Sequence, residues 1–423
     1  MIEKIKNIFV GTKEKKSLFQ NIFSLGVLQI ANYILPLFTV PYLVRVLGPE
    51  YFGLLGFSTA TISYFLILTD YGFNLSATRQ ISIFRDDKDK INEIFSSVMI
   101  IKVGIMTLSF GLMCLLVFSF EKFSQYWEVY FLTFGMVVGQ VLFPVWLFQG
   151  LESMKYITYL NLGAKALFTF CVFVFVQEQS DYWMVPLFTS LGFILVGILS
   201  IIVLKRNFGI IFSYQNKSIL RFQLYEGWHV FLSTVTISFY TISSTFILGL
   251  FTSNIVVGYY TGAEKIIKAV KGLYSPVLKA TYPLVSKKIH KNKQNGLKFL
   301  YKLTWIVGFV MLIISLFLLL FSESIVNLLL GENFRRSIVL LQIMAFLPFL
   351  ISLSNIFGIQ TMLNLGYKKE FSFFVLITAV VALVSSIILI PFYGEIGASV
   401  SLLIGELLIT IILGLFLKSK IKI

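Results

Sequence analysis

Hydrophobic positions along this chain fall into long uninterrupted runs that short polar stretches separate. Runs of about 20 apolar residues are long enough to cross a bilayer as helices. Strands of a membrane barrel would instead show short segments of alternating polarity. The pattern therefore predicts an all-α membrane protein with about twelve transmembrane helices. The predicted spans are 18–46, 52–76, 94–118, 129–150, 157–177, 184–204, 228–251, 255–285, 301–321, 337–363, 371–391 and 397–417.

The longest connection between spans, about 205–227, lies between the sixth and seventh. We expect it to join two six-helix bundles, formed by residues 1–207 and 208–423. A weak internal similarity supports two repeats, because PEYFGLLGFSTA follows the first span and SNIVVGYYTGAE follows the seventh. Parallel repeats of this kind place a substrate path between the halves. Residues 2–9 predict a short amphipathic helix on the membrane surface.

Composition agrees with a membrane protein and also gives its orientation. Of the 423 residues, 57% are hydrophobic and 13% are charged, whereas a soluble protein carries about a quarter charged residues. Of the 35 Lys and Arg residues, 25 lie on the side of the N-terminus, four on the opposite side and six within spans. Basic residues concentrate in cytoplasmic loops, so both termini are predicted in the cytoplasm. The same asymmetry accounts for the net charge of +15 without a nucleic-acid partner.

Six basic residues are predicted at membrane depth, and four of them lie in the eighth span. These four occupy one sector about 120° wide on a helical wheel. A charge at the bilayer centre costs from about 3 to above 10 kcal/mol, so this face needs water, an anion or a carboxylate. We expect a cationic wall of a cavity that attracts an anionic substrate. Side chains near the inner end can instead extend to the lipid headgroups. The cavity lysines are Lys265, Lys268, Lys271 and Lys279, and headgroup contact is equally open for Lys279, Lys102 and Lys165.

Acidic residues within the spans are candidates for ion coupling or gating. Glu264 precedes Lys268 by four residues, which predicts an ion pair on one helix face, and a titrating role is the alternative. Asp70 lies near the inner end of the second span. It is predicted either to pair with Arg79 or a helix terminus, or to serve as a proton or cation site. Glu406 in the last span is a further candidate.

The sequence offers no motif for nucleotide hydrolysis and no pattern for metal binding. The chain has no Walker motif and no glycine-rich phosphate loop, so any active transport is expected to use a gradient of H⁺ or Na⁺. Cys114 and Cys171 lie in apolar runs and are predicted to be small buried hydrophobic residues. His229 and His290 lack partners of the metal-site kind, so no metal or cofactor is expected. Prolines predict bends in several spans, at positions 36, 41, 144, 276, 283 and 348.

Five stretches stand in order across nearly the whole chain. They are VPYLVRVLGPEYFG (40–53), TDYGFNLSATRQIS (69–82), FPVWLFQGLESMKYI (143–157), NIFGIQTMLNLGYKKEF (355–371) and PFYGEIGASVSLLIGE (391–406). Together they resemble the Wzx-type O-antigen flippases, in the polysaccharide-transport branch of the multidrug/oligosaccharidyl-lipid/polysaccharide exporter superfamily. The resemblance implies a V-shaped pair of six-helix bundles around a central lumen.

The implied cargo is an undecaprenyl-pyrophosphate-linked oligosaccharide repeat unit, flipped from the cytoplasmic to the periplasmic leaflet of the bacterial inner membrane. The resemblance also implies a place in O-antigen and lipopolysaccharide biosynthesis, with coupling to protons or sodium. Membrane lipids, a polysaccharide polymerase and chain-length machinery are the implied partners. A pyrophosphate anion also suits a lysine-lined cavity.

Three alternatives remain open. A drug/cation antiporter of the same superfamily is expected to have a more acidic lumen than this lysine face provides. A flippase for a lipid-linked cell-wall precursor would share the fold and the anionic cargo. A polysaccharide polymerase would need a sizeable external loop, and the longest one here, about 322–336, is short although it holds Arg335 and Arg336.

Overall fold

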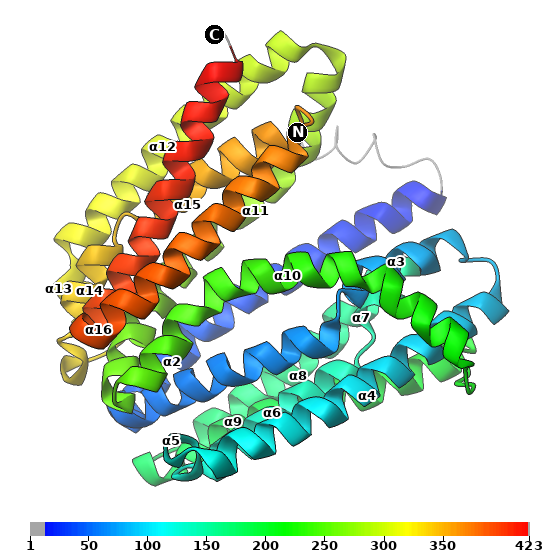
Figure 1. Cartoon of the computed structure of the whole chain (residues 1–423), viewed down its shortest axis with the longest axis horizontal. Helices are drawn as coiled ribbons and strands as arrows, with labels where there is room; N and C mark the ends of the chain where they lie inside the picture. The colour runs from blue at the N-terminus through cyan, green and yellow to red at the C-terminus, as the bar shows by residue number, and fades with distance from the viewer. Residues whose placement is uncertain (1–12, 422–423) are drawn as a thin grey trace. The chain divides into compact units, whose positions relative to one another are not determined.

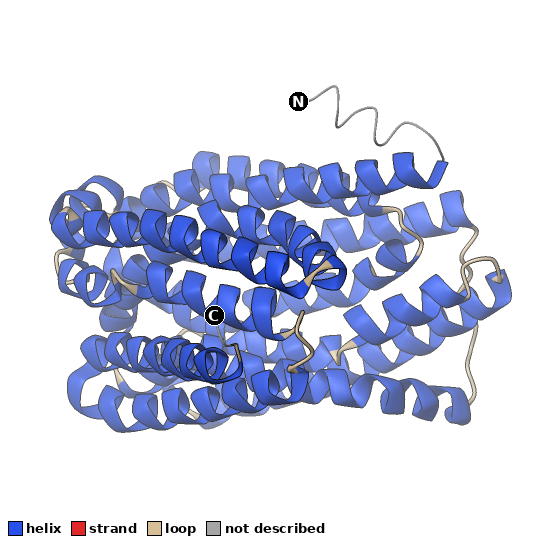
Figure 2. Cartoon of the chain, turned by 90° about the horizontal axis from the view of Figure 1, so that it is seen from above, coloured by secondary structure: helices blue, strands red, loops and turns tan. Residues whose placement is uncertain are grey.

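In the computed structural model of the chain, the described residues are 13–421. Within this range the chain forms helices joined by loops, without a strand among the described residues (Figure 2). The description leaves out the side chains at 13–34, 37, 233, 236–241, 273, 275, 276, 279 and 280. The surface helix predicted at residues 2–9 also lies outside it. The all-α fold predicted from the apolar runs is confirmed.

The helices up to the long connection cover the first six predicted spans. They are α2 (Lys13–Asp70), α3 (Phe73–Ile83), α4 (Lys88–Ser119), α5 (Glu121–Ser124), α6 (Trp127–Leu142), α7 (Val145–Gly150), α8 (Met154–Phe175), the 3₁₀ turn η1 (Gln179–Trp183), α9 (Met184–Val203) and the π-helical turn η2 (Leu204–Phe208). Short helices such as α5 lie in the connections between predicted spans and were not predicted.

The remaining helices cover the last six predicted spans. They are α10 (Lys217–Phe251), α11 (Asn254–Lys291), α12 (Lys293–Leu320), α13 (Ser322–Leu329), the 3₁₀ turn η3 (Glu332–Phe334), α14 (Ser337–Met344), α15 (Leu347–Asn355), the π-helical turn η4 (Ile356–Met362) and α16 (Lys368–Lys420). Several of these begin before the apolar run, as α12 does, because Lys and Gln are good helix formers that hydropathy leaves out.

Glycines in the left-handed region mark two of the predicted span boundaries. Gly48 (φ 70°, ψ 178°) divides the long helix α2, and Gly394 (φ 52°, ψ −127°) divides α16. A side chain with a Cβ rarely adopts these angles, so glycine allows the chain to reverse between adjacent spans. Proline marks two further breaks, since Pro144 separates α6 from α7 and Pro348 lies in the first turn of α15.

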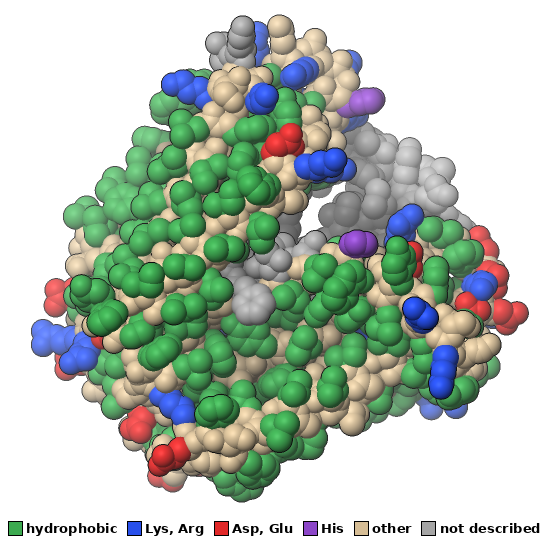
Figure 3. All heavy atoms as spheres, in the orientation of Figure 1, with side chains coloured by type: hydrophobic (Ala, Val, Ile, Leu, Met, Phe, Trp, Pro, Cys, Tyr) green, Lys and Arg blue, Asp and Glu red, His purple; other side chains and the backbone are tan. Residues whose placement is uncertain are grey.

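Eight helical segments of the described residues are long and apolar enough to cross a membrane by length and composition. The segment 368–420 contains the last two predicted spans, and 38–83 contains the second predicted span and the end of the first. Hydrophobic side chains cover the visible sides of the helices, and charged side chains gather toward their ends (Figure 3). Helix α11, which carries the lysine face, is not among the eight segments. Its charges therefore need polar surroundings within the protein.

The chain divides into two compact units. The N-terminal unit contains Met1–Leu35 and Thr61–Val235, and the C-terminal unit contains Pro36–Ala60 and Thr236–Ile423. Each unit holds most of one predicted half. Two stretches differ from the predicted division after residue 207. Residues 36–60 belong to the C-terminal unit, and residues 208–235 belong to the N-terminal unit. The reason is packing: residues 36–60 contact α11, whereas residues 208–235 are fastened to α3 and α4.

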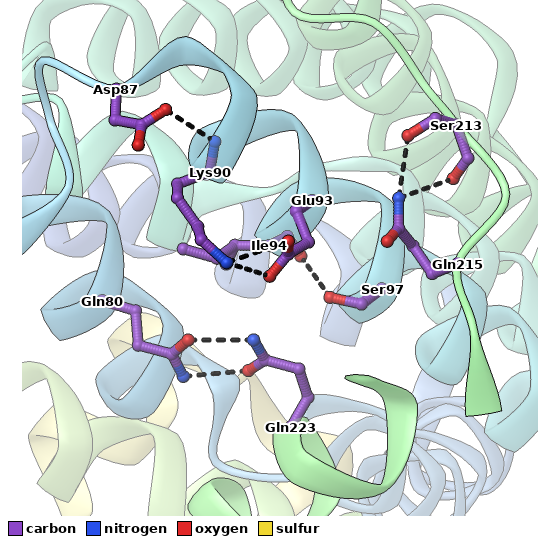
Figure 4. Close-up of polar contacts among 9 residues, drawn as sticks. All are labelled: Gln80, Asp87, Lys90, Glu93, Ile94, Ser97, Ser213, Gln215 and Gln223. Carbon is purple, nitrogen blue, oxygen red and sulfur yellow. Dashed lines mark hydrogen bonds and ion pairs between the residues drawn. The ribbon is translucent and has the colours of Figure 1, made fainter. Parts of the chain in front are cut away.

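In the N-terminal unit, α9 packs against α6 and α8 (Figure 1). Ser200 Oγ of α9 lies 3.2 Å from the Leu142 carbonyl of α6 and 2.7 Å from the Gly197 carbonyl of its own helix, so the buried hydroxyl has an acceptor in both helices. Trp146 and Phe148 of α7 are fully buried in the apolar core of this unit. Two reciprocal hydrogen bonds of 2.9 Å join the side-chain amides of Gln80 in α3 and Gln223 in α10 (Figure 4).

In the C-terminal unit, α11 packs against α12 and α14, and α15 packs against α12 and α16. Tyr274 and Leu278 of α11 lie in an apolar cluster with side chains of α12 such as Val307. Ser337 Oγ at the start of α14 donates to the Tyr259 carbonyl at 2.8 Å. These contacts bury one side of α11 and leave the lysine-bearing side to face a different environment.

Candidate functional site

The lysine face of α11 is one-sided. Lys265, Lys268 and Lys271 are all exposed at the surface of the C-terminal unit. Next to this face Ile267 is 4% exposed, and farther round the helix Val270 packs against the apolar cluster of α11 and α12. This separation follows from the helical period, as the sequence predicted. The side chain of Lys279, the fourth predicted member, lies outside the described residues.

The three described lysines differ in their partners. Lys268 Nζ lies 2.8 Å from Glu264 Oε2, which confirms the ion pair predicted from the spacing of four residues. Lys265 is close enough for its charge to interact with both of them. Lys271 forms no ion pair with any residue that the structure describes. An external anion can therefore reach Lys271 without breaking an ion pair with a described residue.

Two cavities meet at Lys271 within the C-terminal unit. The larger has a volume of about 310 Å³ and the smaller about 160 Å³, and they share Lys271, Asn355 and Ile359. Glu406 of α16, which is 8% exposed, lines the smaller cavity together with Thr378. The structure thus brings together two predicted site residues, Lys271 and Glu406, that lie far apart in the sequence.

The π-helical turn η4 forms one wall of both cavities. Thr361 Oγ1 donates a hydrogen bond to the Ile356 carbonyl five residues earlier, at 2.8 Å. Gln360 Nε2 donates to the Leu278 carbonyl of α11 at 2.7 Å, and this bond fastens η4 to the lysine-bearing helix. The other atom of the same amide, Gln360 Oε1, is buried and accepts no hydrogen bond. Wide turns of this type occur frequently at functional sites.

A second polar group lies in the N-terminal unit. Asp70 at the end of α2 accepts a hydrogen bond of 2.6 Å from Asn74 Nδ2. Lys102 of α4 is 1% exposed and close enough to Asp70 for their charges to interact. Because a buried ammonium is costly unless it is paired, Asp70 is the group that compensates Lys102. The buried position of Lys102 disagrees with the open alternative in which its side chain extends to the headgroups.

The remaining predicted residues lie apart from these two groups. Arg79 is exposed on α3 and forms no ion pair with Asp70, although both residues are described. Lys165 is half-buried in α8. Cys114 and Cys171 are free thiols and half-buried, so they are less buried than predicted. Among the described residues, no group of three or more His, Cys, Asp or Glu side chains is arranged to hold a metal ion.

Sequence reasoning missed the wall that η4 contributes. Asn355 and Gln360 lie in NIFGIQTMLN, an apolar run with single amides, and nothing in it distinguishes a π-helical turn from an α-helix. Amide side chains within a predicted apolar span are the signal that could have indicated a polar site there.

Comparisons with known proteins identify relatives along most of the chain. A family model described as "Polysaccharide biosynthesis protein" matches residues 18–289. A protein of Escherichia coli (strain K12) is 34% identical over 96% of this chain and 98% of its own length. A protein of Shigella dysenteriae is 29% identical over 93% of this chain and 98% of its own. Both relatives carry the name "Putative O-antigen transporter".

Solved structures with a similar fold are transporters. An inward-facing multidrug resistance MATE family transporter of the MOP superfamily aligns with a TM-score of 0.70, covering 93% of this chain and 97% of its own. The lipid II flippase MurJ in an inward closed conformation aligns with a TM-score of 0.71, covering 93% and 87%. Both are 14% identical to this chain, so the likeness concerns the fold alone.

The fold and the polar groups inside it define a multi-pass helical membrane transporter rather than an enzyme. The family match and the relative from Escherichia coli together specify the group more narrowly. The chain belongs to the polysaccharide biosynthesis protein family, whose curated relatives here are O-antigen transporters by name. The resemblance found in the five sequence stretches is thereby confirmed.

Proposed function

We propose that this transporter is a flippase for undecaprenyl-pyrophosphate-linked oligosaccharide repeat units. It moves them from the cytoplasmic to the periplasmic leaflet of the bacterial inner membrane, with both of its termini in the cytoplasm. The observation that carries the proposal is Lys271, an exposed ammonium at the junction of two cavities without an ion-pair partner among the described residues. Such a cation at membrane depth requires an anion or water. Pyrophosphate is the anion of this cargo.

The three described lysines of α11 have different roles in this proposal. Lys271 contacts the pyrophosphate, and Lys265 adds positive potential beside it. Lys268 is held by Glu264 at 2.8 Å, so it contributes to the field while part of its charge is compensated. Lys279, whose side chain lies outside the description, is proposed from the helical period alone as a further member of this face. The lipid tail stays in the bilayer while the charged head passes the lysines.

Coupling to an ion gradient is proposed at one of two carboxylates. Glu406 lines the smaller cavity with Lys271, so a proton or sodium ion bound there would change the field at the anion contact. Asp70 interacts with the buried Lys102, so protonation of Asp70 would leave that cation without compensation. Ion binding at Glu406 or protonation of Asp70 would change the relative stability of two conformations of the transporter. Coupling requires such a change.

The lysine face argues against a cationic drug as the cargo, because like charges repel each other. A lipid-linked cell-wall precursor remains the second candidate, since the lipid II flippase MurJ shares the fold. The two candidates differ in the sugars that accumulate when transport stops.

Deletion and complementation of the gene test the proposal in the bacterium that carries it. We expect the deletion strain to lose its long surface polysaccharide and to accumulate single lipid-linked repeat units, and the intact gene to restore both. Accumulated cell-wall precursor with a normal surface polysaccharide would assign the second candidate. Surface polysaccharide that persists as single repeat units would contradict flipping and indicate a polymerase defect.

A further inference from the structure

An apolar cavity lies in the N-terminal unit and shares no residue with the lysine face. Its volume is about 650 Å³, and it opens between α4, the end of α6, η2 and the residues that follow η2. Ten of its eleven lining residues are apolar, and the eleventh is Lys205. A slot of this composition suits a hydrocarbon chain with one anionic group at its end.

The walls of the slot are built by specific contacts. The π-helical turn η2 ends at Gly209, which has a φ of 65°, and the following residues run along α4. The Ile211 backbone N–H donates to Asn92 Oδ1 at 3.0 Å, and the Ser213 N–H donates to Ser96 Oγ at 2.9 Å. Figure 4 shows the segment at Ser213 beside the helix that carries Ser97. Two hydrogen bonds one helical turn apart hold this wall at a fixed distance from α4.

The slot is accessible from outside the unit. Val103 on α4 is 43% exposed, and Ile211 and Phe212 on the opposite wall are 65% and 58% exposed. On a membrane-spanning unit, exposed apolar walls contact lipid chains and not water. The slot therefore receives its occupant from the bilayer.

Positive charge lies at the end of the slot. Lys205 and Arg206 are both exposed within η2. Lys88 Nζ lies beside Gly209, 3.9 Å from the position a Cβ would take there. Charge counting predicts that this connection faces the cytoplasm, where the leaflet carries anionic lipids. An apolar slot that ends in basic side chains on this side has the composition of a binding site for an anionic lipid head.

We propose that the slot binds one acyl chain of an anionic phospholipid, with the phosphodiester at Lys205. Lys205 is the one basic residue that lines the slot itself, so it is the contact assigned to the phosphodiester, with Arg206 and Lys88 adding positive potential nearby. The bound lipid would pack against the segment 209–216, which leads into α10. The site shares no residue with the lysine face of α11 and does not depend on the proposed cargo.

Native mass spectrometry of the purified full-length protein tests the site. Phosphatidylglycerol and phosphatidylcholine with identical oleoyl chains are added separately, and the binding constant of the first lipid is measured. We expect the intact protein to prefer phosphatidylglycerol by about fivefold, which is the contribution of one basic residue near an anionic lipid. Lys205→Gln should remove this preference. Lys298→Gln, at an exposed lysine of α12 in the other unit, should retain it.

A second variant tests the apolar slot separately from the charge. Val103→Trp places a large side chain into the slot from an exposed position, so the fold is retained, which the melting temperature without lipid verifies. This variant should bind both lipids more weakly than the intact protein. The proposal is overturned if Lys205→Gln keeps the preference, if Val103→Trp binds both lipids normally, or if equimolar undecaprenyl phosphate displaces phosphatidylglycerol.

Discussion

Gly53 and Gly258 pack backbone to backbone at the start of the two helices that the internal similarity relates. A Cβ added at Gly53 would lie 1.8 Å from the Asn254 carbonyl oxygen and 2.5 Å from the Gly258 nitrogen. One added at Gly258 would lie 1.9 Å from the Pro49 carbonyl oxygen. Each glycine thus contacts the residue four positions before the other. The stretches PEYFGLLGFSTA and SNIVVGYYTGAE are therefore similar in sequence and also pack against each other, and each contributes the same kind of contact.

This contact predicts that alanine is not tolerated at either glycine. Gly53→Ala and Gly258→Ala should each destabilise the C-terminal unit by about 1–3 kcal/mol, because the neighbouring atoms belong to the backbone and cannot rotate away. The measurement is the melting temperature of the protein purified in detergent. Gly111→Ala is the matched control, since nothing lies within 4 Å of a Cβ there. Equal melting temperatures for all three variants would show that the helices do not approach as described.

Neutralising the lysine face is expected to remove transport without removing the protein. Lys271→Gln alone should reduce flipping by more than about tenfold, since a hydrogen bond to a charged group contributes about 1.5–3 kcal/mol. The double variant Lys268→Gln/Lys271→Gln should abolish it. Complementation of the deletion strain measures the effect, and a blot of membrane fractions verifies the amount of protein.

The control for these variants is Lys298→Gln/Lys302→Gln, which removes the same charge from two exposed lysines of α12. We expect this variant to complement fully. Full complementation by Lys268→Gln/Lys271→Gln would exclude the lysine face as the anion contact. Equal loss in both double variants would indicate an effect of net charge and not of position.

Thiol accessibility tests the one-sidedness of α11. Cysteines at 268 and 271 should react with a water-soluble thiol reagent in intact membranes, because both side chains are exposed. A cysteine at 270 should not react, because Val270 packs against the cluster around Tyr274. The background is Cys114→Ser/Cys171→Ser, since both native cysteines are free thiols. Equal labelling at all three positions would rule out a polar cavity on one side of the helix.

The Asp70–Lys102 group distinguishes a coupling role from a structural one. Asp70→Asn should reduce flipping more than Asp70→Glu, which keeps the negative charge beside Lys102. Removal of one partner of a buried pair also costs about 3–5 kcal/mol, so the amount of protein must be measured too. Asp70→Asn/Lys102→Met removes both charges and should recover the amount of protein but not its transport. Recovered transport in this double variant would assign the pair a purely structural role.

Much of the fold could be predicted because hydropathy and backbone chemistry act locally. The apolar runs place the predicted spans on helical segments, although 129–150 and 337–363 are each divided into shorter helices. Gly48 and Gly394 mark reversals that hydropathy alone would leave ambiguous. The ion pair of Glu264 and Lys268 follows from helical spacing. These features depend on residues a few positions apart, so the sequence displays them directly.

The tertiary partners of the polar residues could not be predicted. Arg79 is only nine positions from Asp70, yet the charge of Asp70 interacts with Lys102. The packing of α4 buries Lys102, and this packing cannot be derived from local sequence. Glu406 meets Lys271 only through the arrangement of α11, α15 and α16. Gln80 and Gln223 form a pair of amide hydrogen bonds although they are 143 positions apart, so no local sequence pattern predicts this contact.

The sidedness of the accumulated lipid-linked glycan tests flipping most directly. Sealed inner-membrane vesicles of the deletion strain, with the cytoplasmic face inside or outside, are treated with an impermeant reagent that oxidises sugars. We predict that the undecaprenyl-linked repeat unit reacts only when the cytoplasmic face is outside, and that expression of the intact chain moves it to the opposite face while Lys268→Gln/Lys271→Gln does not. A repeat unit already on the periplasmic face without the protein would contradict the proposed function.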